Sequence, residues 1–148
     1  MAVLVSACVM GVNCKYNGKN NLDEVVKKYL KDEDIIMVCP EMMANLGCPR
    51  ACIEMVGKRI MDNTGNDVTD VLNKAANDAL IMLADKDIEY CVLQSRSPTC
   101  GCGHIYDGSF KGKLIAGDGV FAALLKEKGY VAYDVGTFRE LIIKKGYN

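Results

Sequence analysis

The stretch Asp67-Val-Thr-Asp-Val-Leu-Asn-Lys-Ala-Ala-Asn-Asp-Ala-Leu-Ile-Met-Leu-Ala-Asp85, followed at once by Ile88-Glu-Tyr-Cys-Val-Leu-Gln94, decides the fold class. In the first part, apolar residues from Val71 to Leu83 recur at helical spacing, which predicts an amphipathic helix that covers one face of a sheet. The second part is a short apolar run typical of a buried strand. A helix that leads into a buried strand is the building unit of α/β proteins.

The rest of the chain repeats this alternation. Short β-branched runs predict further strands, and amphipathic or glycine-bounded segments predict helices. The segment Met42–Arg59 mixes methionine, glycine and proline, and we predict it to be irregular, with a short helix followed by a loop. The other expected elements are strands at Ala2–Cys8, Asp34–Glu41, Arg59–Asn66 and Tyr130–Val135, and helices at Asn21–Leu30 (with Asn21 as candidate cap), Gly117–Gly129 and Thr137–Lys145 (capped by Thr137).

Strands that alternate with helices favour one parallel sheet with helices on both faces. The sequence contains no repeat, linker or low-complexity segment that would divide it. We therefore predict that residues 1–148 form a single-domain, three-layer α/β sandwich with a mainly parallel, Rossmann-like sheet.

Composition excludes several classes of function. The chain has 148 residues, 50% of them hydrophobic and 25% charged, with a formal net charge of -1. This balance argues against a non-specific nucleic-acid or anionic-membrane binder. The apolar runs are far shorter than the roughly 20 residues of a membrane span, and no basic leader precedes the first strand. We expect a cytoplasmic protein without membrane or nucleic-acid partners, and the sequence leaves its oligomeric state open.

Cysteine is unusually frequent, with eight residues in the chain. A reducing cytosol would keep these thiols free, so they indicate metal or cluster ligation, redox chemistry or small buried side chains. Cys8 ends the first predicted strand, Cys39 ends the second, and Cys100 lies six residues past the end of the third. Because the carboxyl ends of parallel strands meet at one edge, these three thiols are expected to converge there.

The spacing of the cysteines favours an iron-sulfur cluster over zinc. Structural zinc sites usually use paired hooks, and only Cys48-Pro-Arg-Ala-Cys52 has such a spacing, while Cys100-Gly-Cys102 is tighter. Three thiolates delivered singly from three strand ends suit a cluster held by cysteine sulfur. With three protein ligands, one iron stays open to substrate or water, which implies chemistry as well as electron transfer.

Two polar residues near the same edge are candidates for catalysis. Glu41 follows Cys39 by two residues, so it is either an acid/base group near anything bound there or a solvated glutamate. Ser97 precedes Cys100 by three residues and either positions substrate or water or caps a turn. Weaker candidates for the pocket wall or for anion binding are Arg96, Tyr16, Tyr106 and Asp107, whereas His104 and the Gly117-Asp-Gly119 turn are expected to be structural.

Six segments together resemble the family known as domain of unknown function 523, whose characterised branch is the thiouracil desulfidases. They span nearly the whole chain in order. The resemblance implies a three-layer α/β domain with a [4Fe-4S] cluster on three cysteines, whose fourth iron takes the sulfur of a thiolated pyrimidine. The segments are Val5-Ser-Ala-Cys-Val-Met-Gly-Val-Asn-Cys-Lys-Tyr-Asn-Gly18, Val38-Cys-Pro-Glu41, Gly65-Asn-Asp-Val-Thr69, Gln94-Ser-Arg-Ser-Pro-Thr-Cys-Gly101, Ile105-Tyr-Asp-Gly-Ser-Phe110 and Gly117-Asp-Gly-Val120.

Carried onto this sequence, the resemblance implies cluster ligands at Cys8, Cys39 and Cys100, with Cys14 as a competing ligand. It implies an acid/base and substrate-positioning pair in Glu41 and Ser97. The segment Asn45-Leu-Gly-Cys-Pro-Arg-Ala-Cys52 departs from the proline-rich stretch of other members, which leaves the roles of its cysteines, and of Cys102, open.

Two functions follow as hypotheses. The leading one is an iron-sulfur-dependent desulfidase that removes sulfur from a thiouracil-like pyrimidine by a hydrolytic, non-redox route, with the sulfur taken up by the open iron. The alternative is a metal-thiolate or cluster-bearing protein that carries sulfur or senses redox state without turnover. The substrate is a free base, a nucleoside or an RNA-borne nucleotide, and the balanced charge favours a small molecule.

Overall fold

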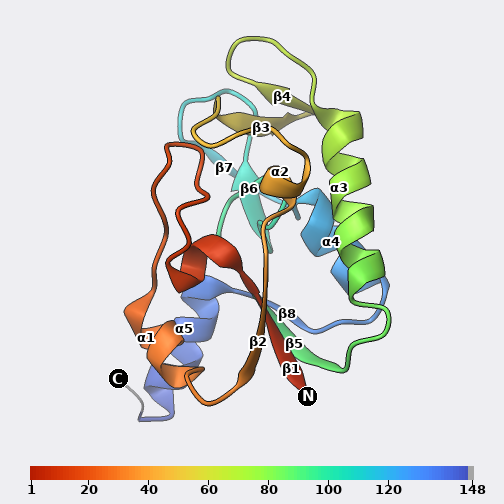
Figure 1. Cartoon of the computed structure of the whole chain (residues 1–148). Helices are drawn as coiled ribbons and strands as arrows, with labels where there is room; N and C mark the ends of the chain where they lie inside the picture. The colour runs from red at the N-terminus through yellow and green to blue at the C-terminus, as the bar shows by residue number, and fades with distance from the viewer. Residues whose placement is uncertain (147–148) are drawn as a thin grey trace.

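Four parallel strands form the central sheet of the protein, seen here in a computed structural model whose described residues are 1–146 (Figure 1). The spatial order is β2-β1-β5-β8, and every neighbouring pair in the sheet is parallel. This confirms the predicted α/β class and its parallel sheet. The strands are β1 (Ala2–Ser6), β2 (Asp34–Val38), β5 (Ile88–Leu93) and β8 (Ala132–Asp134).

The alternation of side chains along β1 and β5 builds a separate core on each face of the sheet. Leu4 and Leu93 pack into one buried cluster, whereas Val3, Val5 and Val92 pack into the other. All five are fully buried. The two central strands are therefore apolar on both sides, as a sheet covered by two helical layers requires.

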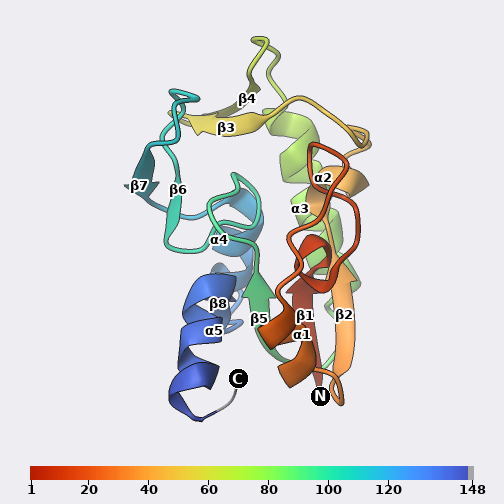
Figure 2. The same cartoon turned by 90° about the vertical axis from the view of Figure 1, so that its left-hand side faces the viewer.

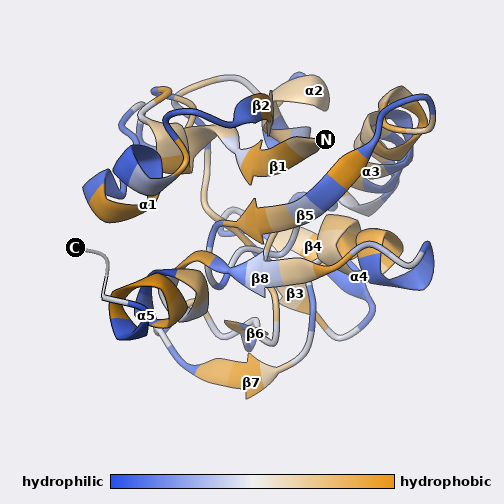
Figure 3. Ribbon diagram, turned by 90° about the horizontal axis from the view of Figure 1, so that it is seen from below, coloured by the Kyte–Doolittle hydropathy of each residue, from blue (hydrophilic) through white to orange (hydrophobic). Residues whose placement is uncertain are grey.

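Two pairs of helices supply those layers. α1 and α5 contact each other and lie on one face, and α3 and α4 do the same on the opposite face (Figures 2 and 3). None of the helices in residues 1–146 is long and apolar enough to cross a bilayer. The helices are α1 (Glu24–Tyr29), α2 (Pro40–Met43), α3 (Thr69–Met82), α4 (Val120–Glu127) and α5 (Val135–Lys144).

Several helix ends differ from the sequence prediction, and capping explains the differences. Asp23, not Asn21, caps α1 by accepting from the Val26 N–H. Asp134 caps α5 by accepting from Gly136 and Thr137, so Thr137 lies inside the helix and is not its cap. An aspartate carboxylate at the N-cap accepts from free N–H groups, and its negative charge is also attracted by the positive end of the helix dipole.

Proline also starts a helix where the sequence predicted only the end of a strand. Pro40 is the first residue of α2, a position where its missing N–H costs nothing. β2 consequently stops at Val38, and Glu41 lies on a helix rather than on a loop. The first strand is likewise shorter than predicted, because Ala7–Met10 form a 3₁₀ helix that contains Cys8.

Two antiparallel hairpins lie beyond the carboxyl end of the sheet, so part of the predicted irregular structure is regular. β3 (Ile53–Val56) pairs with β4 (Arg59–Asp62), and β6 (His104–Tyr106) pairs with β7 (Leu114–Ala116). The prediction of irregular structure was wrong for β3, β6 and β7, whereas a strand was expected where β4 begins at Arg59. The hairpins form the upper part of the molecule in Figure 1.

The topology fixes where a ligand site can form. After β1 the chain moves to β2 on one side, and it then returns past β1 to β5 on the other side. Open α/β sheets bind ligands outside the carboxyl ends of the strands at such a reversal. Here the 3₁₀ helix after β1 and the loop after β5 meet at that point.

Candidate active site

A cavity of about 850 Å³ opens at the reversal point between β1 and β5. Its wall includes Cys8, Cys14, Cys39 and Cys100. The structure therefore brings all three predicted ligand cysteines, and the competing Cys14, to one place from four separate segments. Cys52 also lines this cavity.

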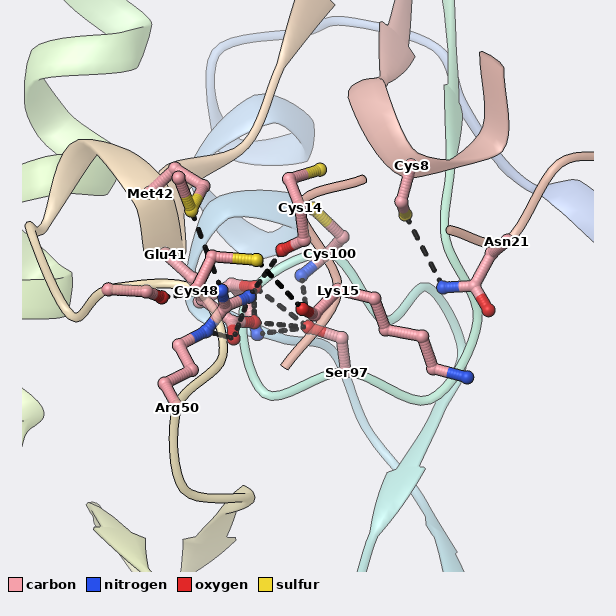
Figure 4. A network of polar contacts seen from close by, with 12 residues as sticks. Cys8, Cys14, Lys15, Asn21, Glu41, Met42, Cys48, Arg50, Ser97 and Cys100 are labelled. Carbon is pink, nitrogen blue, oxygen red and sulfur yellow. Dashed lines mark hydrogen bonds and ion pairs between the residues drawn. The ribbon is translucent and has the colours of Figure 1, made fainter. Parts of the chain in front are cut away.

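The four thiols lie close enough to interact with one another. Cys14 interacts electrostatically with Cys39 and Cys8, and Cys8 does so with Cys39 and Cys100. The Asn21 amide donates to Cys8 Sγ at 3.5 Å (Figure 4). Cysteine sulfurs are the ligands of iron-sulfur clusters, so the residue types fit such a group, although no three Cys, His, Asp or Glu side chains among residues 1–146 are arranged to hold a single metal ion.

Burial favours the protonated form of three of these thiols, Cys8, Cys14 and Cys100. It raises the pKa of Cys8 and Cys100, although hydrogen bonds from Asn21 and Ser6 oppose the increase. Burial, together with the nearby Cys39 and Cys8, raises the pKa of Cys14 to about 12. Because metal ligation requires the thiolate, loading of this site must release protons.

Glu41 projects from α2 into the cavity wall and is ion-paired with Arg50. The Nε and Nη2 atoms of Arg50 lie 3.1 and 3.0 Å from Glu41 Oε1. The Arg50 side chain is only 5% exposed, and the Glu41 side chain is 13% exposed. The interpretation of Glu41 as a solvated glutamate is therefore excluded.

The second carboxylate oxygen of Glu41 faces two hydroxyl groups. Thr99 Oγ1 donates to Oε2 at 2.9 Å, and Ser97 Oγ lies 3.3 Å from the same atom. The two hydroxyl oxygens are 2.7 Å apart. Thr99 is almost fully buried, at 1% exposure, and the sequence analysis missed it. The only signal was a second hydroxyl residue two positions after Ser97.

Ser97 closes a turn, which is one of the two roles that the sequence left open. Its hydroxyl oxygen accepts from the N–H groups of Thr99 and Cys100, at 3.0 and 3.1 Å. This turn fixes the backbone of Cys100, and the residue also lines the cavity. A hydroxyl oxygen has two lone pairs. Since both are engaged, the Ser97 hydroxyl can act only as a donor toward Glu41, Thr99 or a ligand.

Arg50 connects the segment that departs from the family pattern to the rest of the site. Its Nη2 donates to the Cys14 carbonyl at 2.9 Å, and its Nη1 donates to the Gly47 carbonyl at 3.0 Å. Its backbone N–H donates to the Tyr16 carbonyl at 2.7 Å. The guanidinium thus holds the Cys14 loop and Glu41 in a fixed relation (Figure 4). Sequence analysis did not single out this arginine.

The remaining candidates divide between wall and scaffold. Tyr16, Arg96 and Tyr106 line the cavity. His104 is exposed on β6 and lies outside this wall. The glycine of Asp118-Gly119 is required by packing, because a Cβ there would lie 2.5 Å from the Thr99 backbone.

Comparison with known proteins agrees with this geometry. The family model for 2-thiouracil desulfurase matches residues 3–135. The uncharacterized protein YbbK of Bacillus subtilis (strain 168) is 36% identical, over 86% of this chain and 91% of that protein. The solved structure of the [4Fe-4S]-dependent thiouracil desulfidase TudS (DUF523Vcz) superimposes with a TM-score of 0.86 at 29% identity, covering 98% of this chain and 97% of the other. The chain belongs to the 2-thiouracil desulfurase family.

Proposed function

We propose that this chain is a [4Fe-4S]-dependent desulfidase that converts a small thiolated pyrimidine to its oxygen analogue. The observation that carries the proposal is the meeting of Cys8, Cys39 and Cys100 with Glu41 and Ser97 in one cavity. Membership of the desulfurase family and the likeness to TudS support it. The thiols, which must stay reduced, fit a cytoplasmic location.

In this proposal Cys8, Cys39 and Cys100 hold the cluster. Each follows a different strand of the sheet, so the three sulfurs approach from different directions. Cys14, which interacts with Cys39 and lines the same cavity, is a neighbour and not a ligand in this proposal. When bound, the cluster supplies an open iron that takes up the thiocarbonyl sulfur and polarises the carbon-sulfur bond.

The proposed reaction is a hydrolysis in which no electrons are transferred. Thiocarbonyl and water give carbonyl and hydrogen sulfide, so one carbon-sulfur double bond is replaced by a carbon-oxygen double bond. A water molecule must therefore lose two protons, and sulfur must gain them. The group placed to accept the first proton is Glu41 Oε2, because Arg50 saturates Oε1 with two donors.

Ser97 controls access to that oxygen. At rest, Glu41 Oε2 accepts from Thr99 and faces the Ser97 hydroxyl at 3.3 Å. When Ser97 turns its hydroxyl hydrogen toward a bound substrate, one lone pair of Oε2 becomes free to accept from water. Thr99 stays in place and keeps the carboxylate oriented, because its own oxygen is within hydrogen-bond distance of both neighbours.

Sulfide release after anaerobic reconstitution with iron and sulfide tests this function. We expect a brown protein that releases sulfide and uracil in equal amounts from 2-thiouracil. Cys91→Ala is the matched control, since this thiol is fully buried in β5 and lies outside the cavity. A brown protein that binds thiouracil without turnover would support the sulfur-carrier alternative, and a zinc-loaded protein would contradict the cluster.

A further inference from the structure

The loop between β6 and β7 holds a bulky residue in a backbone conformation that such residues rarely adopt. Phe110 has φ +58° and lines the active-site cavity. For a large side chain, a positive φ is an outlier that persists only where the surroundings impose it. The desulfidase chemistry described above does not use this residue, although it ends the segment Ile105-Tyr-Asp-Gly-Ser-Phe110.

Glu54 is the group that imposes the conformation. It lies on β3, is only 8% exposed, and also lines the cavity. Its Oε1 accepts from the Gly108 N–H at 3.0 Å and from the Phe110 N–H at 3.1 Å. A carboxylate that receives two backbone N–H groups forms strong charge-assisted bonds. Glu54 therefore ties the loop to β3 on either side of Ser109.

Close packing of Gly108 makes the same connection rigid. Its φ is +93°, and a Cβ at this position would lie 2.6 Å from the Met55 carbonyl oxygen. Asp107 closes the turn, because its carboxylate accepts from the N–H and the hydroxyl of Ser109, at 2.9 and 2.6 Å. These contacts leave the backbone at residue 110 little freedom, so they fix the direction in which the Cα–Cβ bond of Phe110 points.

We propose that Phe110 is the wall on which the pyrimidine ring stacks, and that Glu54 is the residue that positions it. The inference rests on the proposed function, since it assigns the ring-binding surface of that same site. The same cavity is also lined by the thiols, Glu41 and Ser97, which in the proposed function act on the sulfur end of the substrate. The planar faces of the ring need an apolar partner, and an aromatic side chain provides it for any pyrimidine.

Steady-state kinetics with 2-thiouracil tests the wall. Stacking of a base on an aromatic side chain contributes about 1–3 kcal/mol, and about 1.4 kcal/mol corresponds to a factor of ten. Phe110→Ala is expected to raise KM by about tenfold or more, with kcat within about threefold of wild type, and Phe110→Tyr is expected to keep the wild-type KM. An unchanged KM in Phe110→Ala, or a loss confined to kcat, would overturn the assignment.

Two substitutions at Glu54 separate positioning from proton transfer. Glu54→Ala removes the acceptor and is expected to reproduce the KM defect of Phe110→Ala. Glu54→Gln keeps a carbonyl oxygen for the two N–H groups and is expected to restore most of the affinity. If Glu54→Gln instead abolishes turnover, Glu54 acts on the reacting atoms and not through Phe110. Glu89→Ala, an exposed glutamate on β5, is the control.

A spectroscopic measurement tests stacking in the folded holoprotein. The chain contains no tryptophan, so Phe110→Trp introduces a single reporter. Stopped-flow mixing with 2-thiouracil is expected to quench the fluorescence of this tryptophan before sulfide appears. The control is Tyr133→Trp, which places a tryptophan in the aromatic cluster beside α5 and corrects for absorption of light by the ligand. Equal signals from the two proteins would contradict stacking at Phe110. Failure of the wild-type protein to release sulfide would instead contradict the proposed function.

Discussion

At the scale of single residues, the site depends on which thiols face the cavity and which are only packed in the core. Cys8, Cys14, Cys39 and Cys100 line the cavity, whereas Cys91 lies in mid-strand. Burial raises the pKa of Cys91 to about 12, so it stays a neutral, apolar side chain. Position in the fold therefore separates the candidate ligands from a cysteine that serves packing.

We predict that Cys8→Ala, Cys39→Ala and Cys100→Ala each lose the cluster, because each removes one of three ligands. Cys91→Ala is expected to keep it, at a modest cost in stability. Iron and sulfide analysis after anaerobic reconstitution measures the outcome. Full iron content in Cys39→Ala, together with loss in Cys14→Ala, would show that Cys14 is the third ligand.

Glu41 carries the second prediction at this scale. Glu41→Gln is expected to retain the cluster and substrate binding but to lose about 10²- to 10⁴-fold in turnover, the usual contribution of a positioned acid or base. Ser97→Ala is expected to act more mildly and partly through KM, because its hydroxyl orients substrate while its oxygen also supports the Cys100 turn.

Thr99→Val provides the matched comparison for Glu41→Gln. It replaces the hydroxyl by a methyl group, which removes the 2.9 Å bond to Oε2 and the 2.7 Å contact with Ser97 without changing the charge of the site. We expect a smaller loss of turnover than in Glu41→Gln. Single-turnover sulfide release from proteins of equal iron content measures both losses. An undiminished rate in Glu41→Gln would show that the carboxylate does not activate water.

At the scale of elements, the start of α3 is stabilised by a charged cluster on the far side of the hairpin β3-β4. Asp67 accepts from Arg59 Nε at 2.8 Å and from the hydroxyl and N–H of Thr69, at 2.6 and 2.9 Å. These bonds, with Arg59 the largest contributor, lower the pKa of Asp67 from 3.8 to about 2. The ionised form is thus favoured by folding.

This shift predicts how the stability of the fold depends on pH. A carboxyl whose pKa is lower in the folded state stabilises the protein above pH 3.8, and the contribution is lost as the pH falls toward about 2. Asp67→Asn is expected to lower Tm at neutral pH, with the difference from wild type shrinking below that range. Thermal unfolding of this variant and of the exposed control Asp32→Asn checks it, and a constant difference at all pH values would contradict it.

The elements also show how far the sequence predicts the structure. The four-stranded sheet and its helices were predicted because burial leaves a pattern in the sequence: β1 and the end of β5 are continuous buried apolar runs, and α3 is buried at helical spacing. β7 has three residues, all exposed, so it carries no such pattern. β3 places Glu54 inward among apolar neighbours, contrary to the alternation on which the prediction depends.

The site divides in the same way. Strand ends and motif spacing brought Cys8, Cys39, Cys100, Glu41 and Ser97 forward as candidates, and all five line one cavity, while their roles stay predictions. Arg50 and Thr99 both contact Glu41, from which they are separated by 9 and 58 positions in the sequence, respectively. Such contacts arise only when the chain folds, and no local pattern records them.

At the scale of the whole molecule, the site lies open at one edge of the sheet. The cavity is formed where the segments after β1, β2 and β5 meet, and the two hairpins lie beyond the same end of the sheet (Figure 2). An iron that is accessible to substrate there is also accessible to oxidants. We predict that protein purified in air is colourless and poor in iron, and that anaerobic reconstitution restores it. A cluster that survives days in air, followed by its absorbance, would contradict the open iron.

The central claim is that this chain removes sulfur by hydrolysis at a cluster-bearing site. The most direct test is a single turnover of reconstituted protein with 2-thiouracil in oxygen-isotope-labelled water, without any added reductant. The account predicts equal amounts of sulfide and uracil, with one labelled oxygen in each uracil. A requirement for an electron donor, or release of sulfur as persulfide instead of sulfide, would contradict it.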